Sequence, residues 1–93
     1  MSQALVDIGS LITTSPDLQS GRPIIAGTRT SVRRIVTLYK QGDSADEIVA
    51  DKPYLTLAQV HAALAYYYAN QQIIDQDLEA EATEYERLAS QLS

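Results

Sequence analysis

The sequence predicts a mainly α domain: a small N-terminal β element, a three-helix bundle that contains a helix-turn-helix, and a C-terminal helical arm. Three observations predict this class. The chain has 93 residues, 45% of them hydrophobic, which is enough for one modest core and not for two domains. Helical periodicity starts near residue 32, and capping-box patterns follow at Ser44 and Thr56. We therefore expect residues 1–70 to form the domain and residues 71–93 to form the arm.

Two short segments predict the β element. Residues 11–14 are rich in β-branched side chains, and Pro16 cannot donate a ladder hydrogen bond, so we expect a strand that ends in a turn at residues 15–17. Residues 28–30 are the second candidate strand. The glycine-bracketed segment between them, residues 21–27, is expected to be mainly loop. A sheet this small needs a helix or a second chain to cover it.

Apolar residues spaced by three and four define the first helix, over residues 31–41: Val32, Ile35, Val36 and Tyr39. Ser31 is its expected N-cap and Gly42 its expected C-terminal stop. The second helix spans residues 44–51 and ends before Pro53, because the residue that precedes a proline is disfavoured in the helical region. The third helix spans residues 56–70.

The third helix is apolar on nearly all sides, which predicts burial on more than one face. A domain this small offers little core for such a helix, so we expect a homodimer that covers it. The candidate interface residues lie in its second half: Leu64, Tyr66, Tyr67 and Tyr68.

The charge is unevenly distributed along the chain. The formal net charge is −5 with seven basic residues. Five of these fall within residues 22–40, which contain no acid, whereas acids dominate beyond Asp75. A basic segment beside two helices of helix-turn-helix proportions predicts phosphate contacts, with polar residues at the start of the third helix as base-reading candidates. The candidate DNA-binding residues are Arg29, Arg33, Arg34, Lys40, Thr56 and Gln59.

The arm carries a narrow apolar stripe of the coiled-coil kind with acids on its other faces. Such a stripe is too thin for a monomer core and suits a helix that docks on another protein. Its members are Leu78, Ala82, Tyr85, Ala89 and Leu92, with Leu88 alongside.

The sequence offers little for catalysis. His61 is the single histidine and cysteine is absent, so neither a metal cluster nor a disulfide is expected. No phosphate-binding glycine loop is present, and the acids of the arm lie on a solvated helix. We expect a non-enzyme with no cofactor, no metal and no small-molecule substrate. No apolar stretch is long enough for a membrane span, and no signal peptide is indicated, so a cytoplasmic protein is expected.

Several runs occur in an order that resembles a known family. The most specific is GRPIIAGTR at residues 21–29, followed by the helix stop at Gly42 and the segments at residues 44–48, 53–56 and 62–66. Over residues 11–68 the chain resembles the domain of unknown function 433 family. The resemblance implies a small β element packed on a homeodomain-like helix-turn-helix, with a tendency to dimerise.

The resemblance also implies a function. Many members are encoded beside a PIN-like nuclease and are regarded as antitoxins of type II toxin–antitoxin systems, which neutralise the nuclease by direct binding and in some cases bind promoter DNA. The arm would then dock in a toxin groove, with Arg87 reaching the acids of the nuclease site. The alternative for Arg87 is a pair with Glu84 on its own helix, and for Arg29 a structural role in its turn. Two other functions stay open: a stand-alone DNA-binding regulator and a structural dimeric adaptor.

Overall fold

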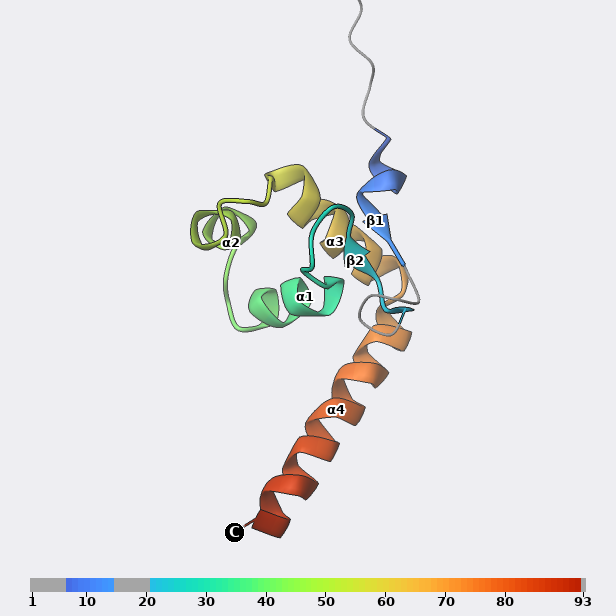
Figure 1. The fold of residues 1–93 in the computed structure, drawn as a ribbon, viewed down its shortest axis with the longest axis vertical. Coiled ribbons are helices and arrows are strands. Elements are labelled where there is room, and N and C mark those ends of the chain that lie inside the picture. The colour runs from blue at the N-terminus through green and yellow to red at the C-terminus, as the bar shows by residue number, and fades with distance from the viewer. Residues whose placement is uncertain (1–6, 15–20, 93) are drawn as a thin grey trace, which may run out of the picture.

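The computed structural model describes residues 7–14 and 21–92 (Figure 1). In chain order these residues form a 3-10 helix η1 (Ile8–Leu11), strands β1 (Ile12–Thr13) and β2 (Ile24–Ile25), and helices α1 (Val32–Lys40), α2 (Ala45–Asp51), α3 (Leu57–Ala69) and α4 (Gln71–Leu92). The predicted fold class, mainly α with a small N-terminal sheet, is confirmed. The turn expected at residues 15–17 lies outside the described residues.

The two strands pair antiparallel, with Ile12 opposite Ile25. The second strand is therefore Ile24–Ile25, and the prediction of a strand over residues 28–30 is wrong. Those residues complete a turn instead, in which the Ile25 amide donates to the Thr30 carbonyl at 2.9 Å. Gly27 supplies the positive φ of 79° that this turn requires. The first strand is also shorter than predicted, because residue 11 ends η1.

The helix boundaries follow the predicted caps. The Ser31 hydroxyl accepts from the amide three residues on, at 3.0 Å, and both capping boxes, at Ser44 and at Thr56, are complete. Gly42 follows α1 with a φ of 108°, the left-handed conformation that ends many helices. These local signals place the helix starts correctly because each hydrogen bond joins residues only three apart.

Helix α3 lies at the centre of the fold and contacts α1, α2, η1 and β1. The chain itself therefore covers this helix on more than one side, which explains its apolar composition without a second copy. The core also draws on β2, the turn before α3, and the start of α4. Its buried members are Ile25, Val32, Ile35, Val36, Ile48, Leu55, Val60, Ala63, Leu64, Tyr67 and Ile74.

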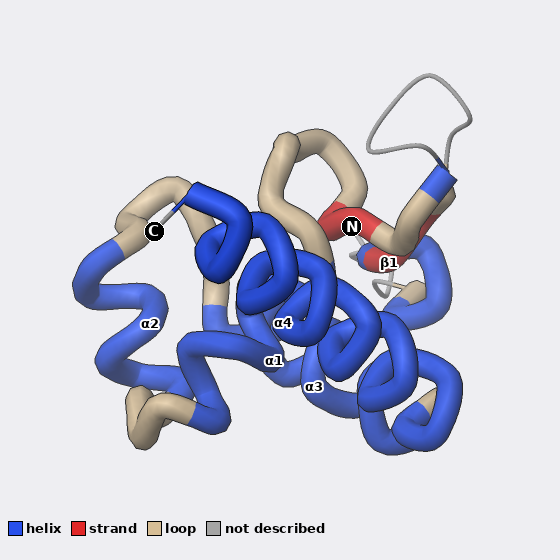
Figure 2. Tube along the Cα trace, turned by 90° about the horizontal axis from the view of Figure 1, so that it is seen from below, coloured by secondary structure: helices blue, strands red, loops and turns tan. Residues whose placement is uncertain are grey.

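Helix α4 begins after a break at one residue, Asn70, whose backbone leaves the helical region with φ −128° and ψ 31°. The Asn70 side-chain amide donates to the Tyr66 carbonyl at 3.0 Å. The break therefore occurs at an asparagine whose side chain bonds the backbone. Neither a glycine nor a proline marks it in the sequence. The first turns of α4 pack on the bundle through Ile74, and the rest extends away from it (Figure 1). Figure 2 shows α4 nearly end-on against α1 and α3.

Candidate functional site

The apolar stripe of α4 packs on the core at its first residue and is exposed to solvent farther along the helix. At about 100° per residue, its members lie within about 40° of a common line along the helix. Leu78 packs against the core, whereas Tyr85 is 75% exposed and Leu92 is 89% exposed. Leu88, at the edge of the stripe, is 47% exposed. The stripe is therefore anchored at its first member and open to a partner over its last three turns.

Two rows of carboxylates flank the stripe, and we call them the acidic rims. One rim consists of Asp75, Glu79 and Glu86, and the other of Asp77, Glu81 and Glu84. The same helical spacing that gathers the apolar residues sets these acids on either side of them. Three of these acids, Asp75, Glu81 and Glu84, pair with cations of the same chain, so a helix that binds the stripe meets a reduced negative charge along its flanks.

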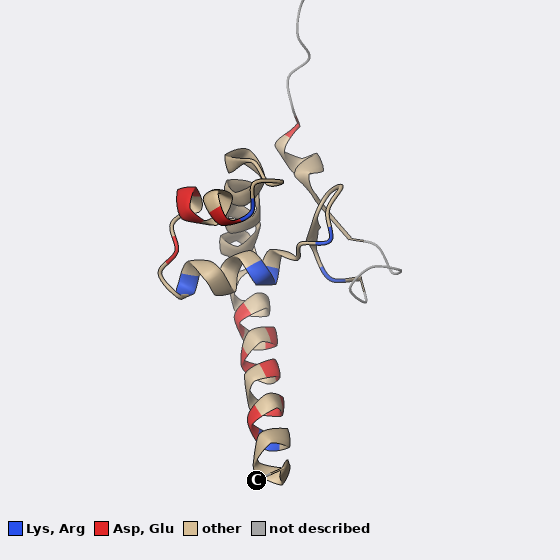
Figure 3. Cartoon of the chain, turned by 60° about the vertical axis from the view of Figure 1, so that its left-hand side comes forward, with Lys and Arg blue, Asp and Glu red and all other residues tan. Residues whose placement is uncertain are grey.

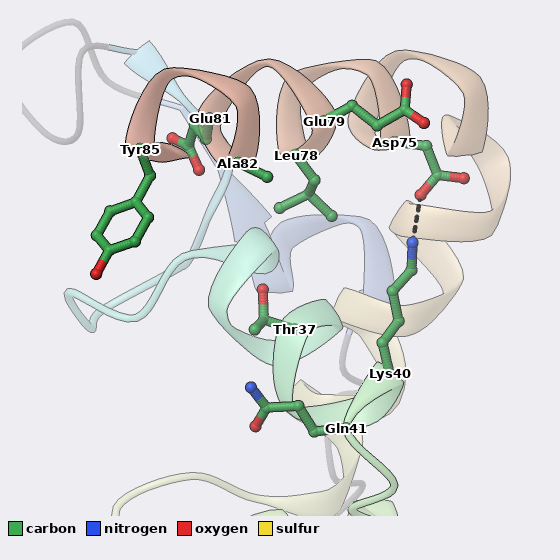
Figure 4. Close-up of a pocket in the computed structure, with 9 residues that line it drawn as sticks. All are labelled: Thr37, Lys40, Gln41, Asp75, Leu78, Glu79, Glu81, Ala82 and Tyr85. Atoms are coloured by element: carbon green, nitrogen blue, oxygen red, sulfur yellow. Dashed lines mark hydrogen bonds and ion pairs between the residues drawn. The ribbon is translucent and has the colours of Figure 1, made fainter. Parts of the chain in front are cut away.

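An open groove of about 760 Å³ separates the first part of the stripe from α1. Thr37 and Gln41 line it on α1, and Leu78, Ala82 and Tyr85 line it on α4. Figure 4 shows the two sets of side chains turned toward one another across the gap. The groove gives the stripe a second wall, so a docked segment would contact both helices.

One carboxylate of α4, that of Glu81, receives two arginines. Arg22 Nη1 donates to Glu81 Oε1 at 3.0 Å, and Arg33 Nη2 donates to the same oxygen. The Arg33 side chain is only 13% exposed, while those of Arg22 and Glu81 are 48% and 44% exposed. Burial is the main influence on Arg33 and lowers the pKa of its guanidinium.

A second contact closes the groove at its inner end. Lys40 Nζ donates to Asp75 Oδ1 at 2.7 Å, and the Tyr67 hydroxyl donates to the same oxygen at 2.8 Å. The hydrogen bond from Lys40 lowers the pKa of the Asp75 carboxyl, and the same bond raises the pKa of Lys40. Lys40 also lies 5.5 Å from the centre of the Tyr67 ring, within range of a cation–π contact.

Sequence reasoning did not join the two charged segments. It assigned Arg33 and Lys40 to phosphate and left Arg22, Asp75 and Glu81 without a role. The structure sets these five residues against one another, so the basic segment faces the acidic helix of the same chain. The opposite signs of the two segments were a signal for this contact, although spacing alone could not say which residues pair.

The residue proposed for a nuclease site, Arg87, lies on the side of α4 opposite the stripe, about 180° from Leu78. Its Nε donates to Glu84 Oε2 at 3.2 Å, which is the intrahelical pair considered as its alternative. A partner that covers the stripe therefore does not reach Arg87 without also wrapping around the helix.

The remaining candidate DNA-binding residues are dispersed. Arg34 is exposed on α1. Arg29 is exposed in the turn that precedes α1, where it lines a shallow pocket together with Tyr54. Thr56 and Gln59 bond each other's backbone in the capping box of α3. The Thr56 hydroxyl and the Gln59 carbonyl oxygen are thus already engaged, and the first exposed positions of the helix are otherwise Leu57, Ala58 and His61.

The candidate dimer residues divide between core and surface. Leu64 and Tyr67 are 7% and 3% exposed and belong to the core of the single chain. Tyr66 is half-buried, and Tyr68 is 54% exposed. Only Tyr66 and Tyr68 therefore present appreciable surface to a second copy.

The Gly-Thr-Arg turn is stabilised by its threonine. The Thr28 hydroxyl donates to the Ile25 carbonyl at 2.8 Å and accepts from the Thr30 amide at 3.0 Å. The Thr30 hydroxyl in turn lies 2.7 Å from that of Tyr54. These bonds connect β2 to the turn before α3, so the motif has a structural function.

Within residues 7–14 and 21–92, no group of three or more His, Cys, Asp or Glu residues is placed to hold a metal ion. Among the helices of the same residues, none combines the length and the apolar character needed to span a membrane.

A family model described as "Protein of unknown function (DUF433)" matches residues 12–67, more than half of the chain. The chain belongs to this family. The crystal structure of a DUF433 member protein from Anabaena variabilis is similar, with 31% sequence identity and a TM-score of 0.70, over 75% of this chain and 69% of that chain. No curated protein matches this DUF433 chain. The family match ends within α3, so the groove and the stripe depend on a helix that lies beyond it.

Proposed function

We propose that this DUF433 protein is a non-catalytic binding protein that docks another protein through α4, as the antitoxin of a toxin–antitoxin pair. The observation that carries the proposal is the exposure of large apolar side chains along one line of a helix that projects from the bundle. Tyr85, Leu88 and Leu92 are 75%, 47% and 89% exposed. Apolar anchors at this spacing are typical of a helix that lies in a hydrophobic groove of its partner.

The acidic rims define the charge of the partner. In paired helices, the residues beside an apolar seam select partners by charge. A second copy of α4 would set acid against acid along both rims, which disfavours self-pairing through this helix. A partner with Lys or Arg beside its apolar groove fits. The family resemblance names a PIN-like nuclease as that partner, and a cytoplasmic complex suits a chain without cysteine.

The test is co-expression with the protein encoded beside this one, followed by affinity purification and measurement of the dissociation constant. Tyr85→Glu places a charge within the stripe, and we expect at least a thirtyfold loss of affinity, or about 2 kcal/mol, as for a central interface anchor. Ala80→Glu adds the same charge on the opposite face of α4 and is the matched control. Equal affinities for the two variants would contradict binding through the stripe.

The alternative of a stand-alone DNA-binding regulator has less support. Helix α3 contains no Arg or Lys, and the Thr56 hydroxyl and the Gln59 carbonyl oxygen at its start are engaged in the capping box. A homodimer remains a prediction that sedimentation at micromolar concentration will decide. If a dimer forms, Tyr68→Glu should weaken it, because that side chain is the most exposed of the candidate interface residues.

A further inference from the structure

Helix α1 lies across the apolar stripe and limits the part of it that a partner can cover. Arg33 of α1 pairs with Glu81 in one acidic rim, and Lys40 pairs with Asp75 in the other. Because these two acids flank the stripe on opposite sides, α1 crosses it between them. The stripe is open beyond this crossing, over residues 82–92, which is about 15 Å of helix. A partner helix of this length would end against α1, in the groove that both helices line.

The flank of the stripe that carries Glu81 is apolar, and its acids are neutralised. Leu88 widens the stripe on this side and is 47% exposed. Glu81 and Glu84 both pair with arginines of the same chain. The remaining acid of this rim, Asp77, lines a different pocket together with Arg33. This flank therefore offers a partner an apolar contact and little net charge.

The opposite flank carries negative charge that the chain does not neutralise. Glu79 and Glu86 are exposed and form no ion pair with any residue that the structure describes, and Glu79 lines the groove. Their spacing in the sequence sets them about 10 Å apart along the helix axis and within about 20° of one another around it. Figure 3 shows acidic positions along most of α4 and a basic position near its end. Two unpaired carboxylates at heptad spacing match two Lys or Arg residues at the same spacing on a facing helix.

We infer that the open part of the stripe receives a partner helix with basic residues on one flank only, spaced by one heptad and paired with Glu79 and Glu86. The other flank of that helix is apolar and covers Leu88. The inference rests on the proposed function and adds the polarity of the partner helix to it. A second copy of α4 lacks this pattern, because its one basic residue, Arg87, lies on the side opposite the stripe.

The test compares two variants of the full chain in complex with the protein encoded beside it, by isothermal titration calorimetry. Glu79→Gln combined with Glu86→Gln removes both unpaired carboxylates. Ala80→Lys combined with Gln91→Lys makes the same change in net charge on the far side of α4, at positions that are also exposed. We expect an affinity loss of at least about fivefold in the first variant and under about twofold in the second, as for two ion pairs at an exposed rim.

The outcomes separate this inference from the proposed function. If no complex forms, both fail. If a complex forms and Tyr85→Glu weakens it, while the glutamine variant binds as tightly as its lysine control, the stripe is the binding surface and the assigned polarity is wrong. Self-association of the chain that Tyr85→Glu abolishes would also overturn the inference, because a second copy would then occupy the stripe. Circular dichroism confirms that each variant keeps its helix content.

Charge reversal identifies the facing residues directly. Glu79→Lys combined with Glu86→Lys sets like charges against one another, and we expect a loss of at least about tenfold that shrinks as salt screens the charges. Changing to Glu two Lys or Arg residues that lie seven positions apart on one helix of the partner should restore most of the affinity. If no such pair in the partner restores binding, the basic flank that we infer does not exist.

Discussion

The two arginines that share Glu81 should differ in their contribution to stability. Arg33 is 13% exposed and Arg22 is 48% exposed. Glu81→Gln leaves the guanidinium of Arg33 partly buried without its anion, and an unsatisfied buried polar group costs about 1–3 kcal/mol, more when it is charged. Glu81 itself is 44% exposed, so solvent screening reduces this, and we expect a loss of about 1 kcal/mol in the free energy of unfolding.

The assay is a pair of double-mutant cycles by urea denaturation, monitored by circular dichroism at 222 nm. The cycle of Arg33→Met with Glu81→Gln should give a coupling of about 1 kcal/mol, and that of Arg22→Met with Glu81→Gln less than about 0.5 kcal/mol. In thermal unfolding, the loss in Glu81→Gln corresponds to about 4–8 °C for a domain of this size. Amide hydrogen exchange in α4 separates its release from global unfolding. Equal couplings in the two cycles would refute the argument that burial distinguishes the two arginines.

Three further predictions rest on single contacts. Because the folded-state pKa of Asp75 is lowered and that of Lys40 is raised, the pair should stabilise wild type over Asp75→Asn at neutral pH. This difference should disappear as pH falls through the lowered carboxyl pKa or rises through the raised ammonium pKa, which pH-dependent thermal melts will show. Thr28→Ala should lower the free energy of unfolding, measured by urea denaturation, by about 1–2 kcal/mol. Thr28→Ser keeps both hydrogen bonds and should lower it markedly less. Ile35→Ala should cost about 2–5 kcal/mol, whereas Tyr85→Ala should change stability by under about 0.5 kcal/mol, so similar losses would contradict the assigned burial.

The helix starts could be predicted because their signals are local. Ser31, Ser44 and Thr56 each bond an amide three residues away, and such a bond depends on the chain's own spacing. The second strand could not be predicted in the same way. Ile24–Ile25 pairs with Ile12 and Thr13, far earlier in the chain than any cap partner, and a two-residue run shows no alternation that separates it from loop.

The apolar part of the candidate site could be predicted from the sequence, and its contacts with the rest of the chain could not. The apolar stripe follows from spacing alone, and its exposed part is where the sequence placed it. What the sequence did not show is that Leu78 docks on the chain's own core and that Lys40 meets Asp75 across the groove. Both contacts depend on the angle between α3 and α4, which is a property of the whole fold.

That angle is set at Asn70, the one residue between two long helices. No glycine or proline stands there, and with helical angles at Asn70 residues 57–92 would form one helix of about 36 residues, about 54 Å long. Such a helix would keep the backbone hydrogen bond from Asn70 to Tyr66 but would withdraw Ile74 from the core. It would also carry both anchoring carboxylates away from α1 in one rotation. The backbone conformation of this single residue thus sets which side chains of α4 lie against α1, because every later residue of the helix follows the direction that it gives.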